Sequence, residues 1–114
     1  MLVVDDEPSI ANTLGAILRH EGFTVAVAHN AAEALQHCNG TCPDVIISDV
    51  MMPGMDGITM AIHIRQQYPS CEILLFSGMA ASNDLLQEAR RQGYNFELLA
   101  KPIHPRELIR KLQG

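Results

Sequence analysis

Residues 44–57, DVIISDVMMPGMDG, combine a buried strand with a rigid loop. The apolar run at 45–47 is typical of the middle of a parallel strand that is covered on both faces. Two positions later the chain places a carboxylate, Asp49, and a proline and two glycines follow it at 53–57. These residues fix the backbone and leave no room for a continuing strand or an immediate helix. The stretch therefore predicts an acid held at the carboxyl end of a buried strand.

The same alternation of buried strand and helix extends over the whole chain. Short β-rich apolar runs alternate with helical patterns five times, which indicates a parallel sheet covered by helices on both faces. The predicted strands are 2–4, 23–28, 45–48, 73–77 and 96–100. The predicted helices are 8–21, a segment capped by Asn30 and closed by Gly40, 58–67, 84–92, and a short last helix that begins at Pro105. We find no repeat or linker, and we expect one α/β domain over residues 1–114.

Nearly every unusual residue follows the end of a predicted strand. Ligands bind at this carboxyl edge in open α/β sheets, so we expect the loops to converge on one site. The residues are Asp5-Asp6-Glu7 after the first strand, Asp49 after the third, Ser77-Gly78 after the fourth and Lys101-Pro102 after the fifth.

This set of side chains indicates a cation and a phosphoryl group. Asp5, Asp6 and Asp49 would repel one another at close range, and with Lys101 they leave a formal charge of −2. A hard divalent ion such as Mg²⁺ balances that charge and prefers oxygen ligands. Asp49 could then act as a nucleophile toward phosphorus, with Lys101 and the Ser77 hydroxyl binding the phosphoryl oxygens.

Four segments carry a resemblance to a known family. VVDDE at 3–7, DVMMPGMDG at 49–57, FSG at 76–78 and AKP at 100–102 resemble the signature loops of the response regulator receiver domain of two-component signalling, of the kind found in chemotaxis regulators. The resemblance covers the whole chain, with the motifs in order at the ends of the expected strands. It implies a flavodoxin-like, doubly wound five-stranded parallel sheet in the order 2-1-3-4-5, with five helices.

The resemblance also implies a role for each site residue. Asp49 would be the phosphoacceptor, with Ser77 and Lys101 as the catalytic side chains beside it. The family often has a cis peptide before Pro102. The implied Mg²⁺ ligands are Asp5, Asp6, Asp49 and the main-chain carbonyl of Met51.

The implied function is a phosphorylation-dependent switch in a two-component phosphorelay. A sensor histidine kinase or a histidine phosphotransfer protein would donate the phosphoryl group. The output surface would be the fourth helix, fifth strand and fifth helix, which would bind an effector domain or protein or support a homodimer. The chain would not be an enzyme beyond Mg²⁺-dependent self-phosphorylation and slow autodephosphorylation.

The sequence departs from the family pattern in one informative place. Receivers usually carry an aromatic residue three positions before the lysine, and here that residue is Leu98, with Phe96 and Tyr94 as the nearest aromatics. We expect phosphorylation to persist while the usual aromatic readout is changed. Only Met1 precedes the first predicted strand and the last helix is short, so we expect a receiver that was trimmed or excised from a longer protein.

Composition excludes several classes of protein. The net charge is −5, with 8 Lys plus Arg against 13 Asp plus Glu, which argues against direct binding of nucleic acid. No apolar run approaches the roughly 20 residues that a membrane span needs, and no secretory signal is visible, so we expect a cytoplasmic protein. The three cysteines show no C-x-x-C spacing, and we expect reduced thiols.

Three alternative functions remain open at this stage. A haloacid-dehalogenase-like phosphatase would need a second acid two residues after Asp49, where this chain has Met51. A flavodoxin would cradle a phosphate in its first loop, which Asp5-Asp6-Glu7 would repel. A receiver that has lost phosphotransfer would survive as a docking or dimerisation module.

Overall fold

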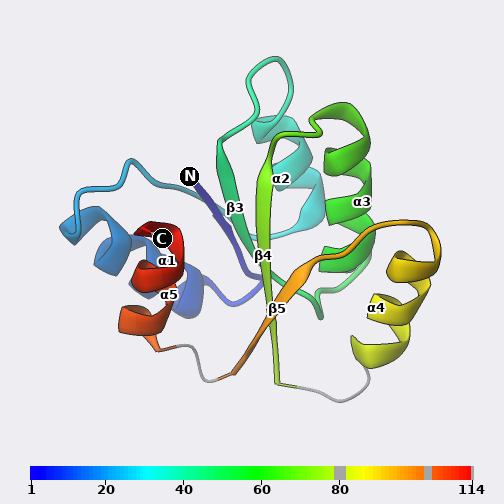
Figure 1. The fold of residues 1–114 in the computed structure, drawn as a ribbon. Coiled ribbons are helices and arrows are strands. Elements are labelled where there is room, and N and C mark those ends of the chain that lie inside the picture. The colour runs from blue at the N-terminus through cyan, green and yellow to red at the C-terminus, as the bar shows by residue number, and fades with distance from the viewer. Residues whose placement is uncertain (79–81, 102–103, 114) are drawn as a thin grey trace.

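The computed structural model describes residues 1–78, 82–101 and 104–113. They form a five-stranded parallel sheet in the order β2-β1-β3-β4-β5, as the resemblance implied. The elements, drawn in Figure 1, are β1 (Leu2–Val4), α1 (Pro8–His20), β2 (Ala26–Ala28), α2 (Ala31–His37), β3 (Val45–Asp49), α3 (Gly57–Gln67), β4 (Glu72–Ser77), α4 (Ser82–Arg91), β5 (Glu97–Ala100) and α5 (Pro105–Gln113).

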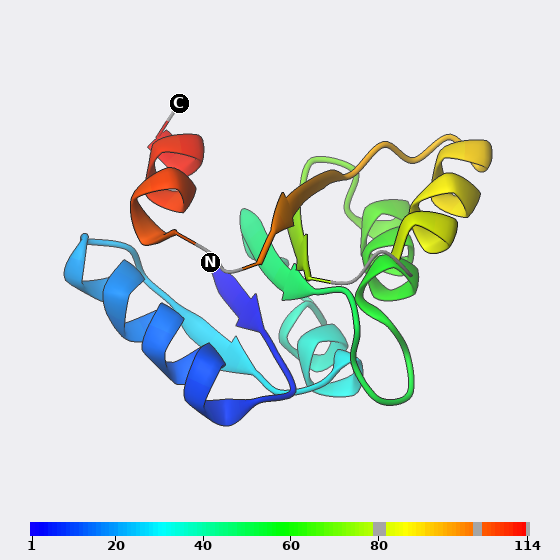
Figure 2. The ribbon, with the colours of Figure 1, turned by 90° about the horizontal axis from the view of Figure 1, so that it is seen from below.

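Helices cover both faces of the sheet. α1 and α5 lie on one face, and α2, α3 and α4 lie on the other, as Figures 1 and 2 show. Each face has its own apolar cluster: Leu14, Leu18 and Leu108 pack against one side of the strands, and Ile58 and Ile64 pack against the other. The central strands are therefore buried on both sides, which explains why they read as continuous apolar runs.

The second strand is shorter than predicted. Only 26–28 pair with β1, because β1 begins at Leu2 and its register places Leu2 opposite Ala26. Residues 23–25 have no neighbouring strand, and the Arg19 guanidinium donates to the Val25 carbonyl instead, at 2.8 Å from Nη2. The prediction of a strand from 23 was wrong at its start, although Phe23 packs against the core.

Side-chain caps fix where two helices begin. Asn30 accepts a hydrogen bond from the Glu33 amide at 2.8 Å, and the Glu33 carboxylate accepts one from the His29 amide at 2.9 Å. These two bonds satisfy donors at the start of α2, as expected from the sequence. Asp56 caps α3 in the same way, accepting from the amide of Thr59 at 2.8 Å and from its hydroxyl at 2.8 Å.

Among the helices of the described residues, none combines the length and apolar character that crossing a lipid bilayer requires.

Candidate functional site

The predicted side chains gather at the carboxyl edge of the sheet. Asp5 follows β1, Asp49 is the last residue of β3, Ser77 is the last residue of β4, and Lys101 follows β5. β3 thus extends one residue further than predicted and includes the acid itself. Parallel pairing aligns these ends, with Asp49 opposite Phe76 on the next strand.

Three carboxylates form one cluster. Asp5, Asp6 and Asp49 each offer an oxygen, and these oxygens all lie within 4.8 Å of one another. Asp5 and Asp49 are buried, with 1% and 4% of their surface exposed, and Asp6 is partly exposed. Burial strengthens the repulsion between them, because there is little water to screen it. The prediction that the first and third loops converge is confirmed.

Asp5 is buried, and within the part of the chain that the structure describes only one of its two carboxylate oxygens has a hydrogen-bond partner. Its Oδ1 accepts a hydrogen bond from the Glu7 amide at 2.9 Å, while its Oδ2 is buried and has no hydrogen-bond partner among the described residues. Burial raises the pKa of Asp5 above its ordinary value, and the negative charge of Asp49 raises it further. The cluster therefore contains a buried oxygen that lacks a positive partner.

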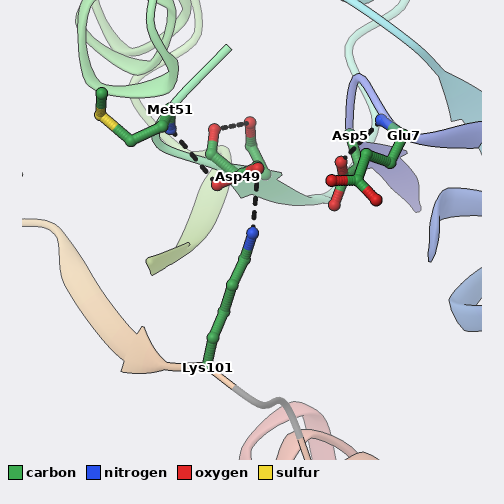
Figure 3. Close-up of polar contacts among 6 residues, drawn as sticks. Asp5, Glu7, Asp49, Met51 and Lys101 are labelled. Atoms are coloured by element: carbon green, nitrogen blue, oxygen red, sulfur yellow. Dashed lines mark hydrogen bonds and ion pairs between the residues drawn. The ribbon is translucent and has the colours of Figure 1, made fainter. Parts of the chain in front are cut away.

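Lys101 supplies a positive charge on the other side of Asp49. Its Nζ lies 3.1 Å from Asp49 Oδ2, and the Met51 amide donates to Asp49 Oδ1 at 3.3 Å (Figure 3). The Lys101 ammonium also lies 5.3 Å from the centre of the Phe76 ring. A cation over an aromatic face is stabilised by the ring quadrupole, so Phe76 helps to hold the lysine at the site. This role of Phe76 was not predicted from the sequence, although its position before Ser77 at the end of β4 was a usable signal.

Ser77 and Gly78 lie beside the lysine. Ser77 is buried at the end of β4, and its carbonyl accepts a hydrogen bond from the Lys101 amide at 3.2 Å. A Cβ on Gly78 would lie 3.4 Å from the Lys101 Cβ, in ordinary van der Waals contact with the lysine side chain.

Gly57 is a second residue whose role the sequence analysis did not recognise. A Cβ at this position would lie 2.1 Å from the Asp49 carbonyl oxygen, a distance that no real contact tolerates. The Gly57 amide donates to the Val50 carbonyl at 2.7 Å. The first turn of α3 therefore lies directly against the end of β3. The Asp-Gly pair at 56–57, just before a helical pattern, indicated a turn but not this close approach.

Two further expectations from the family resemblance concern the residue at position 98 and the peptide bond before Pro102. Leu98 is half-buried and packs against the cluster under α2, α3 and α4, while Tyr94 and Phe96 stack on each other with ring centres 6.1 Å apart. No aromatic side chain therefore stands at the position of the usual readout residue. The expected cis peptide before Pro102 lies outside the described residues.

Comparisons with known proteins agree with this arrangement. The family model described as "Response regulator receiver domain" matches residues 1–113. The chain is 40% identical to an uncharacterized 14.6 kDa protein of Leptolyngbya boryana, over 99% of this chain and 86% of that protein. It is 37% identical to the DNA-binding transcriptional regulator NtrC of Escherichia coli K12, over 94% of this chain but only 22% of that protein. It is 30% identical to the probable transcriptional regulatory protein TcrX of Mycobacterium tuberculosis, of which it spans 48%.

Solved structures give the same result. The chemotaxis protein CheY4 of Vibrio cholerae superposes with a TM-score of 0.85 at 34% identity, over 98% of this chain and 93% of that chain. A CheY-like receiver domain protein of Methanospirillum hungatei superposes with a TM-score of 0.88 at 26% identity, over 98% and 88%. With its sheet order, its carboxylate cluster and the family match over nearly its full length, the chain belongs to the receiver domains of two-component response regulators.

Proposed function

We propose that Asp49 accepts a phosphoryl group from a phosphohistidine of a sensor kinase or histidine phosphotransfer protein, and that the modified domain then changes its binding to an effector. The observation that carries the proposal is the buried cluster of Asp5, Asp6 and Asp49 with Lys101 at 3.1 Å from the acceptor. Family membership supports this chemistry.

The residues present fit Mg²⁺. The donor set consists of carboxylate oxygens, which a small hard cation prefers, and the buried Asp5 Oδ2 is a ligand atom without a partner. Asp5, Asp6, Asp49 and the Met51 carbonyl would hold the ion. A bound Mg²⁺ would supply positive charge that stabilises the phosphoryl oxygens during transfer.

In the transfer step, a carboxylate oxygen of Asp49 attacks phosphorus, a P–O bond forms, and the P–N bond to the donor histidine breaks. The electron pair of the P–N bond stays on the leaving imidazole nitrogen, which takes up a proton from solvent. Lys101, which pairs with Asp49 before the reaction, then binds a phosphoryl oxygen, and the Ser77 hydroxyl donates to another. The chain activates its own acceptor in this way and needs no separate active site.

The output partner is proposed more coarsely. The chain spans about half of TcrX and about a fifth of NtrC, both named as transcriptional regulators, so an effector could lie on the same polypeptide or on another protein. The proposed contact surface comprises α4, β5 and α5. This chain has Leu98 where receivers usually carry the aromatic readout residue. We propose that Leu98, which lies on β5 close in sequence to Lys101, transmits the movement of Lys101 to this surface.

The test is the intact mass of the purified chain after incubation with Mg²⁺ and acetyl phosphate. We expect the parent to gain one phosphoryl group, and we expect Asp49→Asn to gain none. Asp44→Asn is a matched control, because it makes the same chemical change at an exposed acid on the opposite edge of the sheet. It should gain the group like the parent.

Chelation of Mg²⁺ should also abolish the gain. A phosphoryl group that appears in Asp49→Asn would contradict the assignment of the acceptor. No gain in the parent, with acetyl phosphate and equally with a phosphorylated histidine donor, would favour a docking module without phosphotransfer.

A further inference from the structure

All three cysteines of the chain lie together, away from the acidic cluster. Cys38 caps the carboxyl end of α2, Cys42 lies in the connection to β3, and Cys71 precedes β4. The Cys42 and Cys38 sulfur atoms are 3.8 Å apart, and Cys71 lies beside Cys42. These residues are near the amino ends of β3 and β4, whereas Asp49 is at the carboxyl end of β3. The proposed phosphoryl chemistry makes no use of them.

The backbone after α2 brings the first two thiols together. Gly40 has a φ of 91°, a left-handed conformation that residues with a side chain rarely adopt. This turn reverses the chain and returns Cys42 toward the end of α2. The other side of Cys38 is fixed, because its carbonyl accepts a hydrogen bond from the Tyr68 hydroxyl at 2.6 Å. One thiol is thus held on a rigid helix end and the other on a short connection.

We propose that Cys38 and Cys42 are a modification site that a low-molecular-weight disulfide, such as oxidised glutathione, converts to an intrachain disulfide. The sulfur atoms must approach from 3.8 Å to a bond of about 2 Å, and Cys42 can move because residues 39–44 are neither helix nor strand. Cys71 also lies beside Cys42, but its thiol contacts the Pro43 carbonyl at 3.3 Å. We therefore take Cys38, whose sulfur lies 3.8 Å from that of Cys42, as the bonding partner.

The three thiols differ in access. Cys42 is partly exposed, whereas Cys38 and Cys71 are buried at 2% and 5% exposure. Burial raises the pKa of Cys38 and that of Cys71 to about 12, and the neighbouring Cys42 contributes to both shifts. Because the thiolate is the nucleophile, the accessible Cys42 reacts first and a buried thiol reacts second.

The reaction balances in two exchange steps. The Cys42 thiolate attacks one sulfur of oxidised glutathione, forms a mixed disulfide and releases glutathione thiolate. The Cys38 thiolate then attacks the Cys42 sulfur, the intrachain bond forms, and a second glutathione thiolate leaves. Two cysteine thiols are oxidised, one glutathione disulfide is reduced, and two protons are released to solvent or to the leaving thiolates.

The second step should be slow at neutral pH and faster in base. At pH values below the pKa of Cys38, the fraction of this residue present as thiolate increases about tenfold for each unit by which the pH is raised. We therefore expect the mixed disulfide on Cys42 to form first and to decay to the intrachain bond, with the decay faster at higher pH.

The test uses the reduced full chain treated with oxidised glutathione, quenched in acid, unfolded and alkylated with iodoacetamide. We expect the parent to lose two hydrogens and to carry one alkyl group, with a non-reducing digest linking the peptides of Cys38 and Cys42. Cys71→Ala is the matched control and should form the same bond. Cys38→Ala should stop as a glutathione adduct on Cys42.

Three results would overturn the proposal. One is a parent that keeps the glutathione adduct without closing the ring. Another is equal loss of two hydrogens in parent and Cys38→Ala, which would assign the bond to Cys42 and Cys71. The third is oxidation that appears only as a disulfide-linked dimer. The digest of the parent decides among them without relying on the fold of any variant.

Discussion

Asp5 carries a charge that the fold buries and only partly satisfies. The Glu7 amide binds one of its oxygens, and the other has no partner among the described residues. Because burial and the charge of Asp49 raise its pKa, the folded chain without metal keeps the Asp5 proton at pH values where the unfolded chain has lost it. The contribution of Asp5 to stability is therefore fully present below the unfolded pKa and is lost as pH rises through the raised pKa of the folded state.

This loss of stability with rising pH leads to a prediction for Asp5→Asn in the absence of metal. The variant removes the repulsion and keeps a side chain of the same shape, so its free energy of unfolding should exceed that of the parent by about 1 kcal/mol at neutral pH. The advantage should shrink as the pH falls toward about 4. Urea unfolding in the presence of a chelator over this pH range measures the difference. A difference that stays constant with pH would contradict the assigned cause.

The residues of the site were predictable only in part. Acids and a lysine at the ends of parallel strands must meet at one edge, so the grouping of Asp5, Asp6, Asp49 and Lys101 followed from the order of the motifs. Which of two adjacent acids is buried depends on how the chain leaves β1, and no sequence pattern reports that. The same holds for Phe76, whose ring lies under Lys101 only because β4 and β5 pair in this register.

At the scale of elements, the start of α3 is bound to the end of β3 through Gly57. Gly57→Ala would place a methyl group 2.1 Å from the Asp49 carbonyl oxygen, and α3 or β3 would have to shift. We expect a loss of about 2 to 3 kcal/mol in the free energy of unfolding, together with slower phosphorylation of Asp49. Gly15→Ala in α1 is the control, because its nearest neighbour is the Val27 side chain at 3.1 Å. Its effect on stability should stay within about 1 kcal/mol.

The caps of α2 and α3 allow a matched comparison. Asp56→Ala and Asn30→Ala should each cost about 1 kcal/mol, since each removes the side chain that binds an amide in the first turn. Only the α3 cap adjoins the loop that leaves Asp49. Phosphorylation rates measured from acetyl phosphate should therefore fall for Asp56→Ala and not for Asn30→Ala. Equal rates in the two variants would show that the α3 cap acts on stability alone.

The elements themselves were largely predictable, and the main error has a clear physical origin. Alternating buried runs and capped helices are local patterns, so the order and type of all ten elements followed from them. The length of a strand depends on its neighbour. Residues 23–25 have strand-like composition, but β1 begins only at Leu2, opposite Ala26, and therefore gives them no strand to pair with.

For the whole molecule, the carboxylate cluster links stability to metal. An ion that binds only the folded chain stabilises it, by about 2.7 kcal/mol at a concentration one hundred times its dissociation constant. Mg²⁺ should therefore raise the melting temperature of the parent, while Asp5→Asn should lose most of that increase. Potassium chloride at matched ionic strength is the control for screening of the net charge of −5. An equal increase in both proteins would place the effect of Mg²⁺ outside the cluster.

The close contact at Gly57 also has a consequence for protein engineering. Asp49, the proposed acceptor, would lack the turn that fixes its main chain if it were transplanted alone onto another parallel sheet. The transferable unit is the continuous segment 45–60, which includes the strand, the loop, the cap at Asp56 and the glycine that lets the next helix touch the Asp49 carbonyl. A design that keeps the aspartate but replaces this glycine would retain the carboxylate but not the main-chain geometry that positions it.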